Sequence, residues 1–93
     1  MLRSQQGMPE ICRFYGIVIR MYFMDHAPPH FHAEYNENEA LIAIDSMAVV
    51  SGSLPVRARR LVMEWASMHH DELRVAWGRV KRMESPGRIE PLQ

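Results

Sequence analysis

Histidine is concentrated in one short segment of the sequence, residues 26–32, which holds three of the five histidines. Histidine changes its charge near neutral pH and is also the commonest metal ligand in proteins. His30 and His32 are two positions apart, so in a strand their rings would project from the same face, about 6.5–7 Å apart along the chain. This spacing allows a metal site, proton transfer by a pair of imidazoles, or a structural role.

The first interpretation is a site for Zn²⁺ or a similar divalent ion. Its predicted ligands are His26, His30 and His32, and Asp25 or Glu34 could supply the third ligand in place of His26. Three nitrogen or oxygen ligands with a water molecule in the fourth position are typical of catalytic zinc. A His-x-His pair is common, however, so the pattern by itself does not decide the matter.

The second interpretation is a metal-free site that acts on a phosphodiester. The predicted catalytic residues are His30, His32, Arg20 and Glu34. Histidine and glutamate could transfer protons, and arginine could stabilise the charge that develops on the phosphate. Tyr22 could stack on an unpaired base, so this face could also bind RNA.

The third interpretation is structural. Asp25 and His26, with the two prolines that follow, could organise a rigid turn in which the carboxylate accepts backbone N–H groups. The rings of His30 and His32 would then hydrogen-bond neighbouring strands or contact a partner protein, as buried polar groups generally do.

Alternating polar and apolar residues predict the strands that carry these side chains: residues 17–24, 30–35, 40–44 and 47–50. In the second strand the apolar residues Phe31, Ala33 and Tyr35 are expected to face the core. The polar side chains then share the outer face, with His26 at its rim: Arg20, Tyr22, His30, His32 and Glu34. A slip of one residue in the register would exchange the two faces.

After Pro55 the apolar residues recur at threes and fours, which predicts an amphipathic helix. One uninterrupted helix would be about 40 Å long, too long for a domain of this size. We therefore expect a break at residues 69–71, with Ser53 and Asp71 as N-caps. The predicted fold is α+β: an antiparallel sheet of three to four strands, followed by one or two C-terminal helices on one face.

Length and composition limit the class of protein. The 93 residues suffice for one domain, which we place at residues 8–84 between a leader (1–7) and a tail (85–93). No apolar run approaches the ~20 residues of a membrane span. The one cysteine, Cys12, excludes an internal disulfide and a zinc site built from cysteine pairs. We expect a cytoplasmic protein that binds no membrane.

Charge is balanced overall but uneven along the chain. The formal net charge is zero; residues 1–54 carry three basic and six acidic side chains, and residues 55–93 carry eight and five. The basic excess begins in the helical region, where Arg57 and Arg60 are candidate binding residues for nucleic acid or an acidic partner.

One long motif resembles a known bacterial family. Residues 25–32 read Asp-His-Ala-Pro-Pro-His-Phe-His, and later pieces, Gly-Ser-Leu-Pro at 52–55, Glu-Trp-Ala at 64–66 and Trp77, also fit. The chain is similar over residues 8–81 to a domain of unknown function with the signature DH-x-PPHFH. The resemblance implies a small bacterial protein encoded beside a second small protein, in a toxin–antitoxin-like pair. It assigns no catalytic residue.

Two function classes follow from these observations. The first is a component of a two-gene regulatory or toxin–antitoxin-like system that binds a co-encoded partner, nucleic acid or both. The alternative is a hydrolase, metal-dependent or ribonuclease-like, that uses the histidine face. An open sheet also has two edges, so a homodimer is a third expectation.

Overall fold

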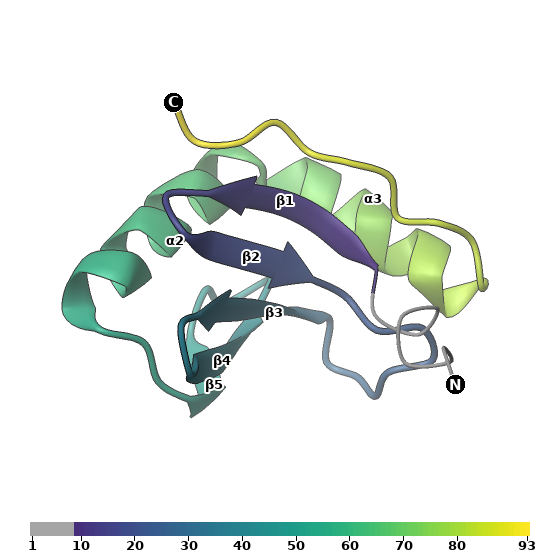
Figure 1. Ribbon diagram of the computed structural model, residues 1–93. Helices are drawn as coiled ribbons and strands as arrows, with labels where there is room; N and C mark the ends of the chain where they lie inside the picture. Colours follow the sequence, from purple (N-terminus) through teal and green to yellow (C-terminus); the bar gives the residue numbers. More distant parts are fainter. Residues whose placement is uncertain (1–8) are drawn as a thin grey trace, which may run out of the picture.

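The computed structural model describes residues 9–93, and the leader predicted for residues 1–7 lies outside the described residues. Five strands precede two helices (Figure 1). Their bounds are β1 (Glu10–Phe14), β2 (Ile17–Arg20), β3 (His30–Tyr35), β4 (Asn38–Ala43), β5 (Val49–Gly52), α2 (Val56–Met68) and α3 (His70–Lys81). The strands form one antiparallel sheet in the order β1-β2-β3-β4-β5. The α+β class is confirmed, but the expected three to four strands are five.

β1 is the strand that the sequence pattern missed. Ile11 and Cys12 are adjacent in the chain and both are buried. The register of the β1–β2 pair shifts between Glu10 and Cys12, as at a β-bulge. A bulge inserts an extra residue and so removes the period of two on which strand prediction depends.

The expected bounds of other strands also need correction. β2 ends at Arg20 rather than at residue 24, and Met24 has a φ of +59°, which is not a strand conformation. β5 begins at Val49 because Met47, with a φ of +63°, belongs to the turn after β4. Such left-handed residues interrupt a strand without any change in hydrophobicity.

The helical region breaks where the length argument predicts. α2 and α3 meet at His69, whose backbone N–H donates to Ala66 and Trp65. The predicted caps are wrong: α2 is preceded by Pro55 and α3 by His69, and neither helix has a side-chain cap. In the described part of the chain, neither helix has the length and apolar character to cross a membrane.

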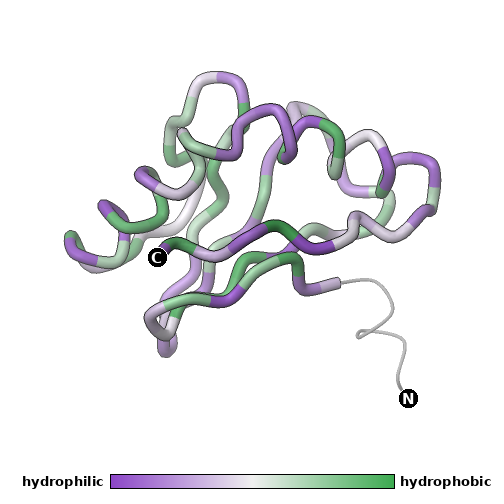
Figure 2. The backbone as a smooth tube through the Cα atoms, turned by 90° about the horizontal axis from the view of Figure 1, so that it is seen from above, coloured by the Kyte–Doolittle hydropathy of each residue, from purple (hydrophilic) through white to green (hydrophobic). Residues whose placement is uncertain are grey.

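The main core lies between the sheet and the helices. Trp65 of α2 packs against Phe14 and Phe31, with ring centroids 5.5 and 6.0 Å apart. Both helices lie together on one side of the strands, and hydrophobic and hydrophilic residues alternate along them (Figures 1 and 2). The apolar face of the helices and the Phe31 face of the sheet therefore shield each other from water.

The C-terminal segment crosses the outside of β1 (Figure 1). The backbone N–H of Ile89 donates to the Ile11 carbonyl (3.0 Å), and the side chain of Ile89 is buried. The indole N–H of Trp65 donates to the Glu90 carbonyl at 2.8 Å. The residues predicted as a tail thus cover the β1 edge of the sheet.

Candidate functional site

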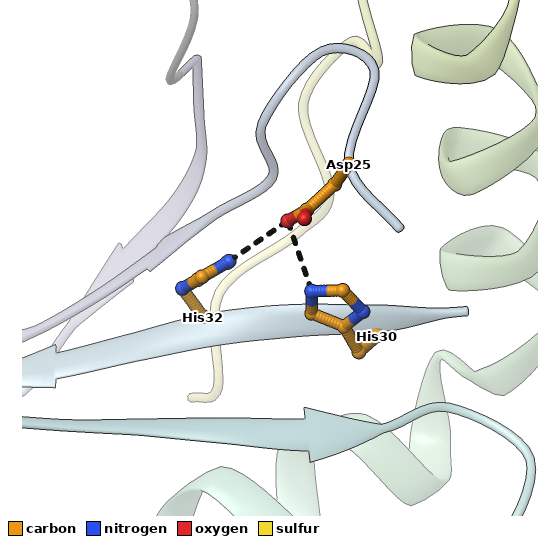
Figure 3. Close-up of side chains that lie close together, drawn as sticks. All are labelled: Asp25, His30 and His32. Carbon is orange, nitrogen blue, oxygen red and sulfur yellow. Dashed lines mark hydrogen bonds and ion pairs between the residues drawn. The ribbon is translucent and has the colours of Figure 1, made fainter. Parts of the chain in front are cut away.

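Asp25, His30 and His32 converge on one point over the first residues of β3, the central strand of the sheet (Figure 3). His30 Nε2 lies 2.9 Å and His32 Nε2 lies 3.2 Å from the same carboxylate oxygen, Asp25 Oδ2. The three candidate ligand atoms all lie within 4.8 Å of one another. Within residues 9–93, this is the one group of three histidine, cysteine or acidic side chains close enough to share a metal ion.

The elements explain why these residues meet. His30 and His32 alternate with Phe31 along β3, so they project from the face opposite to the main core. The loop between β2 and β3 brings Asp25 over that face (Figure 3). Two hydrogen bonds hold Asp25: its Oδ1 accepts the backbone N–H of His26 (2.8 Å), and its carbonyl accepts from Lys81 Nζ of α3 (2.9 Å).

The second ring nitrogen of each histidine also has a defined partner. His30 Nδ1 lies 2.8 Å from the Pro28 carbonyl oxygen, and His32 Nδ1 lies 2.9 Å from Glu39 Oε2. All four ring nitrogens therefore face oxygen acceptors, and both imidazoles are fixed in orientation. Glu39 stands diagonally across the β3–β4 pair from His32, since His32 pairs with Leu41 and Glu34 with Glu39.

His30 and His32 are buried, which corrects the expectation that their rings lie on an exposed outer face. His30 is 6% and His32 is 7% exposed. The ring of Tyr22 stacks on His32 with centroids 4.1 Å apart, and Trp77 of α3 packs against His30 at 5.2 Å. The β-strand pattern placed both histidines on the face away from Phe31, but it could not show that the β2–β3 loop and the Trp77 side chain of α3 lie against them.

Electrostatics favour a charged Asp25. Burial acts to raise the pKa of its carboxyl, but hydrogen bonds from His32, the His26 N–H and His30 outweigh burial, and the pKa is lowered overall. Burial, with the nearby charge of Glu39, raises the pKa of Tyr22, so its phenol stays protonated at neutral pH. The site is a carboxylate enclosed by two imidazoles and a neutral phenol.

The other predicted site residues are not among the three converging side chains. His26 is exposed and contributes only its backbone N–H to Asp25. Arg20 and Glu34 form an ion pair (3.2 Å) on the same sheet face, with Arg20 directly opposite His32 in the register. Arg57 and Arg60 are exposed on the first turns of α2.

Sequence reasoning missed three residues that shape the site: Glu39, Trp77 and Lys81. Glu39 was placed in a turn, whereas β4 already begins at Asn38. A two-residue hairpin turn after Tyr35 would have put Glu39 near His32 by register alone. No local signal indicates Trp77 or Lys81, because their approach depends on how α3 docks.

The comparisons with known proteins identify a family but no activity. The model of a family described as a domain of unknown function, DUF4160, matches residues 16–78, which include all three residues of the cluster. No curated protein and no solved structure matches the chain. Because the match covers more than half of the sequence, the chain belongs to the DUF4160 family.

Proposed function

We propose that the domain binds one divalent transition-metal ion through Asp25 Oδ2, His30 Nε2 and His32 Nε2. The observation that carries the proposal is the convergence of both Nε2 atoms on Asp25 Oδ2, with an oxygen acceptor at each Nδ1. The Pro28 carbonyl and the ionised Glu39 carboxylate can only accept hydrogen bonds. A metal ion on both Nε2 atoms would place the proton of each neutral imidazole on Nδ1, where these acceptors can take it.

This arrangement leaves a lone pair on each Nε2. Both lone pairs then point toward one oxygen of the Asp25 carboxylate. Three electron-rich atoms are stable at this separation only when positive charge lies among them. That charge is either an additional proton on each imidazole or a metal ion held by all three atoms.

The surroundings favour the metal. A histidine that binds a metal commonly donates its other N–H to a carboxylate or a backbone carbonyl, which fixes the ring and increases its basicity. His32 has Glu39 and His30 has Pro28 in these roles. Ligands about 2.0–2.2 Å from one ion lie about 3.0–3.5 Å apart. The separation of 3.2 Å between Asp25 Oδ2 and His32 Nε2 lies in this range, and that of 2.9 Å to His30 Nε2 lies just below it.

Two imidazoles and one carboxylate suit Zn²⁺ and neighbouring first-row ions. Three protein ligands leave a position for water, and the ion increases the acidity of that water, so the centre is of a type that supports hydrolysis. Arg20 and Glu34, which flank His32, are the residues we assign to contact with a substrate. Metal-dependent hydrolysis is the activity we propose to follow from metal binding.

Metal content tests this proposal directly. We would load tag-free protein with Zn²⁺, remove the excess by buffer exchange and measure bound metal by elemental analysis. We expect stoichiometric zinc in the wild type and loss of zinc in Asp25→Asn and in the double variant His30→Ala/His32→Ala. The matched controls are His26→Ala and Glu34→Gln, a neighbouring histidine and a carboxylate of the same face, and both should retain zinc.

Two outcomes would contradict the proposal: a folded wild type that retains no first-row metal ion, or an Asp25→Asn variant that binds zinc as tightly as the wild type. Circular dichroism of each variant separates loss of the site from loss of the fold.

A second candidate function is binding of nucleic acid or a co-encoded small protein, as in a toxin–antitoxin-like pair of bacterial genes. The exposed arginines of α2 favour it, because Arg57, Arg59 and Arg60 lie in a helical start without acidic residues. Co-expression with the adjacent gene product, followed by co-purification and a nucleic-acid binding assay at low salt, tests it. Absence of both interactions would rule it out.

A further inference from the structure

A hollow of about 270 Å³ opens between the sheet and the start of α2. Tyr15, Ile17 and Tyr35 line its sheet side, and the chain from Pro55 to Leu61, including Arg57, lines the other. None of the three candidate metal ligands lines it. Its volume lies just below the usual range of ligand pockets, about 300–1,000 Å³, so it suits one small group.

Tyr15 stands in a conformation that its side chain does not favour. It occupies the two-residue turn between β1 and β2, with a φ of +50°, and Gly16 follows with a φ of +81°. Turns with two positive φ angles favour Asn, Asp and Gly. Tyr15 is nevertheless 57% exposed. A strained aromatic residue that gains little from burial points to a role in binding.

The second tyrosine is close to the same turn. A Cβ atom at Gly16 would lie 3.3 Å from Cε1 of Tyr35, so the absence of a side chain at Gly16 leaves room for the Tyr35 ring. Two aromatic rings therefore border the hollow, one largely exposed and one half-buried. Aromatic rings of this kind are the platforms on which unpaired bases stack.

The opposite wall is positively charged. Arg57 lines the hollow, and Arg59 and Arg60 follow within the same turn of α2. All three are exposed, and no ion pair is found for them within residues 9–93. Basic residues at a helix start oppose the helix dipole. The combination of two rings and this charge matches a ligand with a planar base and an anionic phosphate.

We propose that this hollow binds a nucleotide unit of single-stranded RNA, with the base against Tyr15 and Tyr35 and the adjacent phosphate at Arg57. The site is independent of the proposed metal centre. The proposal rests on the second candidate function and assigns specific residues to its nucleic-acid alternative. A duplex keeps its bases stacked inside and cannot place one in the hollow. A free nucleotide carries the same base and phosphate groups as the strand.

Fluorescence anisotropy with a fluorescein-labelled, mixed-sequence 12-nucleotide RNA tests the proposal at low salt. Tyr15→Asn removes the ring and places a residue that favours the turn, so the fold should be retained. We expect about tenfold weaker binding for Tyr15→Asn, the change that loss of one stacked base produces. Tyr15→Phe should bind within about twofold of the wild type, because the stacking surface remains.

Charge is tested separately. Arg57→Gln should weaken binding several-fold and reduce the slope of log K against log salt by about 0.7, the value for one phosphate contact on a single strand. Arg82→Gln, directly after the end of α3 and paired with Glu84, is the matched control and should bind as the wild type does. Unlabelled single strand should compete, free AMP and UMP should compete weakly, and an RNA duplex should not.

The proposal fails if the wild type does not bind the strand, and the nucleic-acid alternative then fails with it. It also fails if the wild type binds but Tyr15→Asn and Arg57→Gln bind equally well, in which case nucleic acid binds elsewhere on the chain. Equal competition by the duplex, or Tyr15-dependent binding of a co-encoded protein without binding of RNA, would likewise overturn it. Zinc content of Tyr15→Asn should equal that of the wild type in every case.

Discussion

At the scale of single residues, the cluster depends on groups outside its three candidate ligands. Glu39 and the Pro28 carbonyl fix the ring nitrogens of His32 and His30, and Lys81 holds the backbone of Asp25. Orientation of this kind is expected to contribute to metal affinity even where the supporting residue does not touch the ion.

Replacement of Glu39 tests that contribution. Glu39→Ala should lower the affinity for Zn²⁺ by about 10–100-fold, because the His32 ring loses its acceptor. Glu39→Gln should lose less, since its amide oxygen can still accept from Nδ1. Competition with a chromophoric chelator measures both. Glu37→Ala, an exposed neighbour in the turn, is the control, and an unchanged affinity of Glu39→Ala would show that Glu39 has no such role.

The lowered pKa of Asp25 predicts a pH dependence of stability. A carboxyl whose pKa falls on folding stabilises the native state above its unfolded pKa, near 3.8, and that contribution disappears as the pH falls through the lower folded value. In the presence of a chelator, wild type should therefore be more stable than Asp25→Asn at pH 6, and the difference should shrink below about pH 4. Urea unfolding at several pH values measures it. A difference that grows on acidification would contradict this account.

At the scale of elements, periodicity and length in the sequence predicted a strand and a helix break correctly. Features set by single residues, such as a bulge or a left-handed conformation, were missed. β3 and the break between α2 and α3 follow from alternation and from length, and both are found. β1 was missed because of its bulge, and β2 was extended past a left-handed residue. The spacing of His30 and His32 predicted that both rings lie on the same face of the strand. Asp25 was only one of three possible third ligands, because its approach to both rings depends on the path of the nine-residue loop between β2 and β3.

Gly52 links the sheet to the site. It has a φ of +73°, and a Cβ atom there would lie 2.1 Å from the carbonyl oxygen of Glu39. Gly52→Ala should therefore destabilise the protein by about 1–3 kcal/mol and should also weaken Zn²⁺ binding, since Glu39 must shift.

Gly78→Ala in α3 is the opposite case: its Cβ would lie 3.6 Å from the Arg82 side chain, and stability should rise by about 0.5–1 kcal/mol.

Urea unfolding of both glycine variants gives the free energies, and the chelator competition gives the affinity. A Gly52→Ala variant as stable as the wild type would mean that β5 can move away from Glu39 without cost. The proposed coupling between this strand and the cluster would then be absent.

At the scale of the whole molecule, one edge of the sheet is covered and the other is not. The C-terminal segment covers the β1 edge, through Ile89 and the hydrogen bond from Trp65 to the Glu90 carbonyl. No strand pairs beyond β5 within the described chain, and Val49 and Val50 of β5 are exposed. Uncovered edges promote association between copies, so the C-terminal segment should protect the protein from one of two routes to association.

Removal of residues 85–93 tests this protective role. A chain that ends at Glu84 loses the buried Ile89 side chain and the acceptor for the Trp65 indole, which should cost about 2–4 kcal/mol and lower Tm by about 10–20 °C. The exposed β1 edge should also make sedimentation depend on concentration more strongly than in the full chain. Glu90→Ala keeps the backbone carbonyl that Trp65 contacts, so it should match the wild type in both measurements. A truncated chain with an unchanged Tm and unchanged sedimentation would show that the sheet is closed on this side without its C-terminal segment.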